Sequence, residues 1–145
     1  MFNSRFYVGW LLSAILMYTA FYVFHGIITN DLIKLSIPTT VFLSVAGFVY
    51  LAVGFIMSAL FKSVTLKKNI KTPYKRALLI GISSALFLYA VAFVVGVSFS
   101  YQITMLNAMV DISWQLIEQN LGAFVVCLTN TLFYREEEEF HTNYM

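Results

Sequence analysis

Long apolar runs separated by short polar connectors dominate the hydropathy pattern of this chain. A bilayer core of about 30 Å requires about 20 helical residues, and four runs reach that length with little interruption by charge. They predict membrane-spanning helices at residues 6–28, 40–61, 77–99 and 104–134. Helices are expected because lipid offers no partner to backbone polar groups, and because the alternation typical of membrane barrel strands is absent.

The composition supports this interpretation, since 60% of the 145 residues are hydrophobic and only 11% are charged. A soluble fold could not bury so much apolar surface. We therefore expect an all-α integral membrane protein, a single four-transmembrane-helix bundle over residues 1–145. The first run lacks a small-residue cleavage signature and is interpreted as a retained helix. Cys127 is the only cysteine, so an intramolecular disulfide is excluded.

Basic residues are concentrated between the second and third runs, where residues 62–76 hold six of the nine. Cytoplasmic loops carry such an excess, so this loop is predicted to face the cytoplasm. Both termini then lie on the same side with Arg5, Arg135 and the acidic tail at 135–145, while Lys34 alone lies outside. We expect a bacterial inner (plasma) membrane. The charge cluster is a topology signal, and no nucleic-acid binding is expected.

Polar side chains follow one face of the fourth run. At about 100° per residue, Asp111, Gln115, Glu118 and Gly122 point in nearly the same direction. A carboxylate that faces lipid costs on the order of 2.5 kcal/mol or more. We therefore expect this stripe to face the other helices, with Asp111 outside the apolar core and Glu118 just inside it. Asn120 projects to the opposite side and is not explained by this pattern.

The first run supplies a possible partner for Glu118. Tyr18, Tyr22 and His25 recur at helical spacing, and His25 falls near the same outer boundary. A His/Glu pair at one depth could relay protons or bind a cation or headgroup. The alternative is structural: an interfacial histidine, and a glutamate bonded to a neighbouring helix. The candidate polar, proton or ligand site comprises His25, Tyr22, Asp111, Gln115 and Glu118.

Small residues mark the second and third runs. Gly47 and Gly54 lie on one helical face, and Gly81 and Gly96 lie on another. Small residues allow the close backbone approach that drives helix association in lipid. We expect these two runs to pack against each other through these faces.

Two classes of function remain open. One is a non-enzymatic accessory or assembly subunit that contacts the lipid bilayer and other membrane subunits, or a second copy of itself. The other is a proton-coupled or small-solute transport or binding protein built on the outer His/Glu/Asp site, although no internal repeat supports a transporter. Enzymatic activity is less favoured, because the chain has no catalytic motif. Neither a cofactor nor a metal ion is expected, since metal-ligand spacing is absent.

Overall fold

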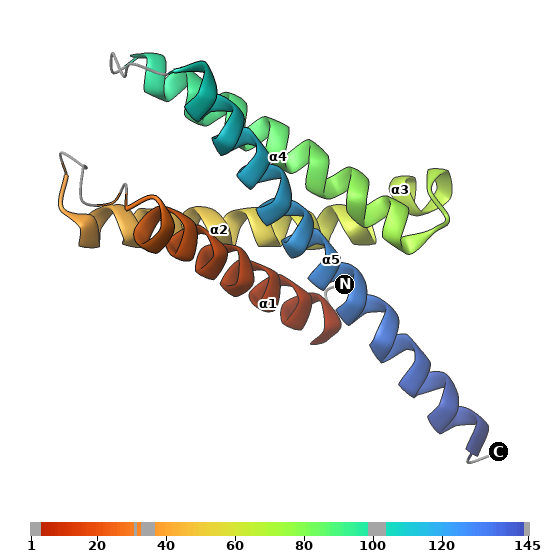
Figure 1. Ribbon diagram of the computed structural model, residues 1–145. Coiled ribbons are helices and arrows are strands. Elements are labelled where there is room, and N and C mark those ends of the chain that lie inside the picture. The colour runs from red at the N-terminus through yellow and green to blue at the C-terminus, as the bar shows by residue number, and fades with distance from the viewer. Residues whose placement is uncertain (1–3, 31, 33–36, 99–103, 144–145) are drawn as a thin grey trace.

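The computed structural model describes residues 4–30, 32, 37–98 and 104–143, and every regular element within them is a helix (Figure 1). In chain order these are α1 (Ser4–Phe21), the π-helix η1 (Tyr22–Ile28), α2 (Thr39–Lys62), α3 (Val64–Asn69), α4 (Pro73–Ser98) and α5 (Met105–Asn143). Within the described ranges, three helical stretches are long and apolar enough to cross a membrane: Ser4–Ile28, Thr39–Lys62 and Pro73–Val94.

The predicted four-helix bundle is therefore confirmed only in a coarser form, an all-helical chain with three candidate membrane helices. The fourth run folds as α5 but is not among those candidates. In addition, the basic loop contains a helix of its own, α3, which the hydropathy pattern did not predict. Backbone bonds from Lys67 N to Ser63 O (3.0 Å) and from Ile70 N to Leu66 O (2.8 Å) support it. So short a helix depends on its surroundings more than on its own sequence.

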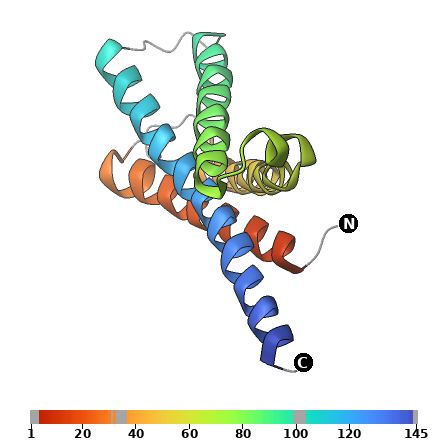
Figure 2. The same cartoon turned by 90° about the vertical axis from the view of Figure 1, so that its right-hand side faces the viewer.

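The helices form two antiparallel hairpins. Helices α1 and α2 pair through bonds from Trp10 Nε1 to Leu51 O (2.7 Å) and from Tyr18 Oη to Leu43 O (3.3 Å). Helices α4 and α5 pair in the same way, with Tyr89 Oη donating to Ala108 O at 3.2 Å. Helix α5 packs against both α1 and α4, so it is the central helix of the fold (Figure 1 and Figure 2). The start of α1, the helix α3 and the end of α5 lie at one end of the molecule.

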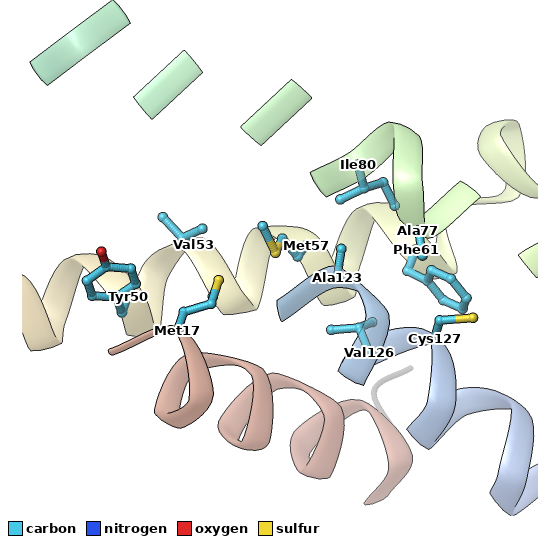
Figure 3. Close-up of a cluster of buried hydrophobic side chains, with 10 residues drawn as sticks. All are labelled: Met17, Tyr50, Val53, Met57, Phe61, Ala77, Ile80, Ala123, Val126 and Cys127. Atoms are coloured by element: carbon cyan, nitrogen blue, oxygen red, sulfur yellow. The ribbon is translucent and has the colours of Figure 1, made fainter. Parts of the chain in front are cut away.

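The apolar core lies where α5 crosses α2 (Figure 3). Helices α1, α2, α4 and α5 all contribute to it, with Met17 and Met57 completely buried. Its members are Met17, Tyr50, Val53, Met57, Phe61, Ala77, Ile80, Ala123, Val126 and Cys127. The core therefore joins the two hairpins at the level of the middle of α5.

The glycines of α2 and α4 allow close helix approach, but α2 approaches α1 and α4 approaches α5, whereas the sequence predicted that α2 and α4 approach each other. A Cβ on Gly54 would lie 3.0 Å from Trp10 O, so Gly54 faces α1, and the nearest side chain to Gly47 is Tyr18, also on α1. A Cβ on Gly81 would lie 2.9 Å from the Asn120 Cα, so Gly81 faces α5. The expectation that these faces of the second and third runs meet each other is wrong. Gly96 lies outside the residues whose side chains are described.

Candidate functional site: a buried polar cluster on helix α5

Three consecutive polar residues lie in the interior at the middle of α5. Glu118 is 1% exposed and Gln119 is 0% exposed, and Asn120 is partly buried. Consecutive residues of a helix point about 100° apart, so three of them can be covered only if other helices surround α5 at this level. The central position of α5 explains their burial. We call Trp114, Glu118, Gln119 and Asn120 the α5 polar cluster.

Glu118 Oε1 accepts a hydrogen bond from Gln119 Nε2 at 3.0 Å. The Tyr50 hydroxyl on α2 and the Trp114 ring N–H, one turn earlier on α5, also interact electrostatically with this carboxyl. Trp114 Nε1 and Glu118 Oε2 nevertheless form no hydrogen bond with any described residue. Glu118 therefore presents an unbonded acceptor atom beside two donor groups.

The cluster contains further unbonded polar atoms. Gln119 Oε1 and Asn120 Oδ1 are buried and accept no hydrogen bond from the described part of the chain. Buried polar groups in proteins are nearly always hydrogen-bonded, and an unsatisfied one costs about 1–3 kcal/mol. In a membrane protein, a buried ionisable residue is by default a functional candidate. Chemically, the carboxyl with its neighbouring donors could bind a cation, a water molecule or a small hydrogen-bonding solute, or pass a proton.

Asn120, which the one-face pattern left unexplained, faces α4. Its Nδ2 donates to Leu116 O at 2.8 Å, and its side chain lies directly over Gly81. The absence of a side chain at Gly81 makes room for it. The sequence signal was the run Glu118–Gln119–Asn120 itself, because polar groups pointing in three directions indicate a helix covered on more than one side.

The structure places the predicted stripe residues at different depths. Glu118 and Gly122 are buried, Gln115 is partly buried and Asp111 is exposed. Met17 of α1 fills the space beside Gly122. Inward orientation of the stripe agrees with the burial of its inner half, and the exposure of Asp111 agrees with a position outside the apolar core.

On the first helix, Tyr22 is exposed and its ring lies over Gly26, while His25 is partly buried. Both belong to the π-helix, where Thr29 N donates to Phe24 O at 2.8 Å, five residues back. The helical spacing from Tyr18 to His25 is therefore interrupted, because a π-helix advances less per residue around its axis than an α-helix.

Aromatic contacts connect η1 with the α5 polar cluster. Phe24 stacks on Trp114 with ring centroids 4.3 Å apart and planes 8° apart. The His25 ring contacts Phe21 and Phe24, each with centroids 5.0 Å apart. Phe24 thus contacts both His25 and Trp114 of the α5 polar cluster. The direct pairing of His25 with Glu118 stays a prediction.

Sequence reasoning did not include Gln119 or Trp114 in the site. Both residues lie off the predicted stripe, and only their contacts place them beside Glu118. Among the described residues, no group of three His, Cys, Asp or Glu side chains could hold a metal ion.

No family model, no curated protein sequence and no solved structure matches this chain.

Proposed function

We propose that α5 is a fourth membrane-spanning helix. Its exposed hydrophobic side chains within residues 117–132 lie on one stripe, formed by Ile117, Leu121, Phe124, Leu128 and Leu132. This stripe is about 22 Å long at 1.5 Å per residue. Within residues 117–132, the polar side chains of Glu118, Gln119 and Thr129 are buried against other helices, and those of Asn120 and Asn130 are partly buried. Apolar residues toward lipid and polar residues toward the bundle are what a spanning helix requires.

The proposed orientation has both termini and the loop at 62–76 in the cytoplasm of a bacterial cell. With four crossings, eight of the nine basic residues lie on one side, and only Lys34 lies on the other. This asymmetry follows the positive-inside rule. The position of the start of α1, of α3 and of the end of α5 at one end of the molecule supports the same arrangement (Figure 1).

Within this topology the chain acts as a non-enzymatic accessory or assembly subunit of a larger membrane complex. The observation that carries this proposal is the open outer part of the α4–α5 hairpin. Residues 90–94 of α4 are all exposed, and five consecutive residues cover every side of a helix. In residues 105–111 of α5, every side chain except that of Ala108 is exposed. No other described helix covers this part of the hairpin.

The two halves of α4 differ in burial. The half that begins at Pro73, the inner half, buries Arg76, Ala77, Ile80, Gly81 and Ala85 against the rest of the chain. The outer half presents the small residues Ala90 and Ala92 together with Phe93, a mixture that permits close packing with another transmembrane helix. Because lipid gives no hydrophobic drive for association, a partner helix would bind here through van der Waals packing.

A site-specific cross-linking experiment tests this proposal. A photoreactive benzoylphenylalanine replaces Phe93, which lies on the open hairpin, or Phe48, which is 74% exposed on α2. Irradiated cells are expected to give a discrete adduct with a different membrane protein from position 93. Position 48 faces lipid in the proposed bundle and is expected to give little or none, so it is the matched control.

The adducts are identified by mass spectrometry, with two differently tagged copies of the chain expressed together. Equal adduct yields from both positions, or no protein adduct from position 93, would overturn the accessory-subunit proposal. An adduct formed solely with a second copy would instead favour a self-associating protein.

The second candidate function is proton or small-solute handling at the α5 polar cluster. The observation that favours it is the unbonded Oε2 of Glu118, a fully covered carboxyl oxygen beside Tyr50 and Trp114. The residues predicted to form this site with Glu118, on the outer side of the membrane, are His25, Tyr22, Gln115 and Asp111. This function would require the chain to self-associate, because four helices rarely enclose a wide pathway by themselves.

A further inference from the structure

A groove of about 630 Å³ lies beside the start of α4, and none of the residues of the α5 polar cluster lines it. Its polar end is formed by Asn69, Lys71, Thr72 and Lys75, and its apolar floor by Leu78, Leu79 and Ile82. Both lysines are exposed. The groove therefore combines two available positive charges with an apolar surface.

Lys75 and the floor residues occupy a single helical face. Positions 75, 78, 79 and 82 follow the spacing of one stripe along α4. The stripe extends about 10 Å along the helix axis from the lysine. Leu78 is 54% exposed and Leu79 is 44% exposed, so no other described helix covers this face. Positive charge at one end and apolar side chains along the axis match a headgroup followed by an acyl chain.

The position of the groove selects the kind of ligand. It begins at the first turn of Pro73–Val94, one of the stretches able to cross a membrane, so its polar end lies at a bilayer surface. Six of the nine basic residues lie in this connection. Anionic lipids of the cytoplasmic leaflet attract such basic segments. The guanidinium carbon of the buried Arg76 lies 4.4 Å from the Phe61 ring centroid, a contact that holds the start of α4 against α2.

We propose that this groove binds an anionic phospholipid of the adjoining leaflet. Lys71 and Lys75 bind the phosphate, Thr72 and Asn69 offer hydrogen bonds to it, and one acyl chain lies along Leu78, Leu79 and Ile82. The site depends on membrane insertion but not on any partner protein, so it stands or fails independently of the accessory-subunit role.

Native mass spectrometry of the full chain in mild detergent tests the site. Phosphatidylglycerol and phosphatidylcholine with identical acyl chains are titrated separately. Binding of the anionic lipid is expected to be at least about tenfold tighter, and the double substitution Lys71→Gln/Lys75→Gln is expected to abolish most of that preference. The matched control Lys67→Gln/Lys68→Gln removes the same charge from exposed positions of α3 outside the groove, and we expect a change below about threefold.

Two further arms separate a lipid site from general charge attraction. Leu79→Trp fills the apolar floor and keeps both lysines, so it is expected to weaken phosphatidylglycerol binding; gel filtration verifies that the variant is folded, and Ile82→Trp repeats the test. Millimolar glycerol 3-phosphate, which carries the phosphate without acyl chains, is expected not to displace the lipid. The proposal would be overturned if the two double variants lost the preference for phosphatidylglycerol equally. It would also be overturned if neither tryptophan substitution weakened binding, or if glycerol 3-phosphate displaced the lipid.

Discussion

Glu118→Ala is expected to be less stable than Glu118→Gln by about 2 to 4 kcal/mol in free energy of unfolding. Both substitutions remove the carboxyl charge, so their difference isolates the acceptor atom and the volume of the side chain. Glutamine keeps an oxygen that can accept the hydrogen bond from Gln119 Nε2, which is 3.0 Å from Glu118 Oε1. Alanine leaves that amide unbonded and opens a cavity, because Glu118 is 1% exposed.

Thermal unfolding and denaturant titration of the two variants in detergent measure this difference in the free energy of unfolding. Equal stabilities of the two variants would contradict the contact geometry of the cluster. A double-mutant cycle of Glu118→Gln with His25→Ala then tests the predicted pairing of these two residues. A coupling free energy above about 0.5 kcal/mol indicates a linked site, whereas additive effects would assign His25 and Glu118 to separate structural roles.

Gly81→Ala is expected to destabilise the protein by about 1–3 kcal/mol, because it overpacks the contact between α4 and α5. A Cβ at Gly81 would lie 2.9 Å from the Asn120 Cα and 2.8 Å from its Cγ, so backbone as well as side chain must move. Rotation of the Asn120 side chain alone cannot relieve the clash. The two helices must separate, which also disturbs the α5 polar cluster.

Gly47→Ala provides the matched control. Gly47 is likewise a glycine within a helix long and apolar enough to cross a membrane, but the nearest atom to its Cβ position is Tyr18 Cε2 at 3.9 Å, an ordinary contact. Alanine there is expected to be neutral or slightly stabilising, since it reduces the flexibility of the unfolded chain. Thermal midpoints of the two variants in the same detergent are compared. If Gly81→Ala is as stable as Gly47→Ala, the close approach of α4 and α5 at Asn120 is wrong.

The sequence predicts three helical stretches able to cross a membrane and the burial of Glu118 for clear physical reasons. Apolar length alone identifies the first three helical stretches, because the bilayer thickness sets a minimum. The cost of a carboxyl in lipid predicts the inward orientation of Glu118. Neither inference requires knowledge of which helix covers which.

Other features depend on the partner of each surface, which one sequence does not reveal. Glycine indicates close approach, but only the packing decides that Gly54 meets α1 and that Gly81 meets Asn120. A one-face description of α5 misses Gln119, since a central helix is covered on several sides. The π-helix at Tyr22–Ile28 coincides with the stacking of Phe24 on Trp114, a contact between residues ninety positions apart that local spacing does not encode.

The central claim is that α5 crosses the membrane with its polar residues inside the bundle. Single cysteines introduced at Met105, Lys68 or Thr142 in a Cys127→Ser background test it directly with a membrane-impermeant thiol reagent applied to intact cells. The account predicts labelling of position 105 from outside, and labelling of positions 68 and 142 only after the membrane is permeabilised. Labelling of positions 105 and 142 from the same side would show that α5 does not cross the membrane and would contradict the account.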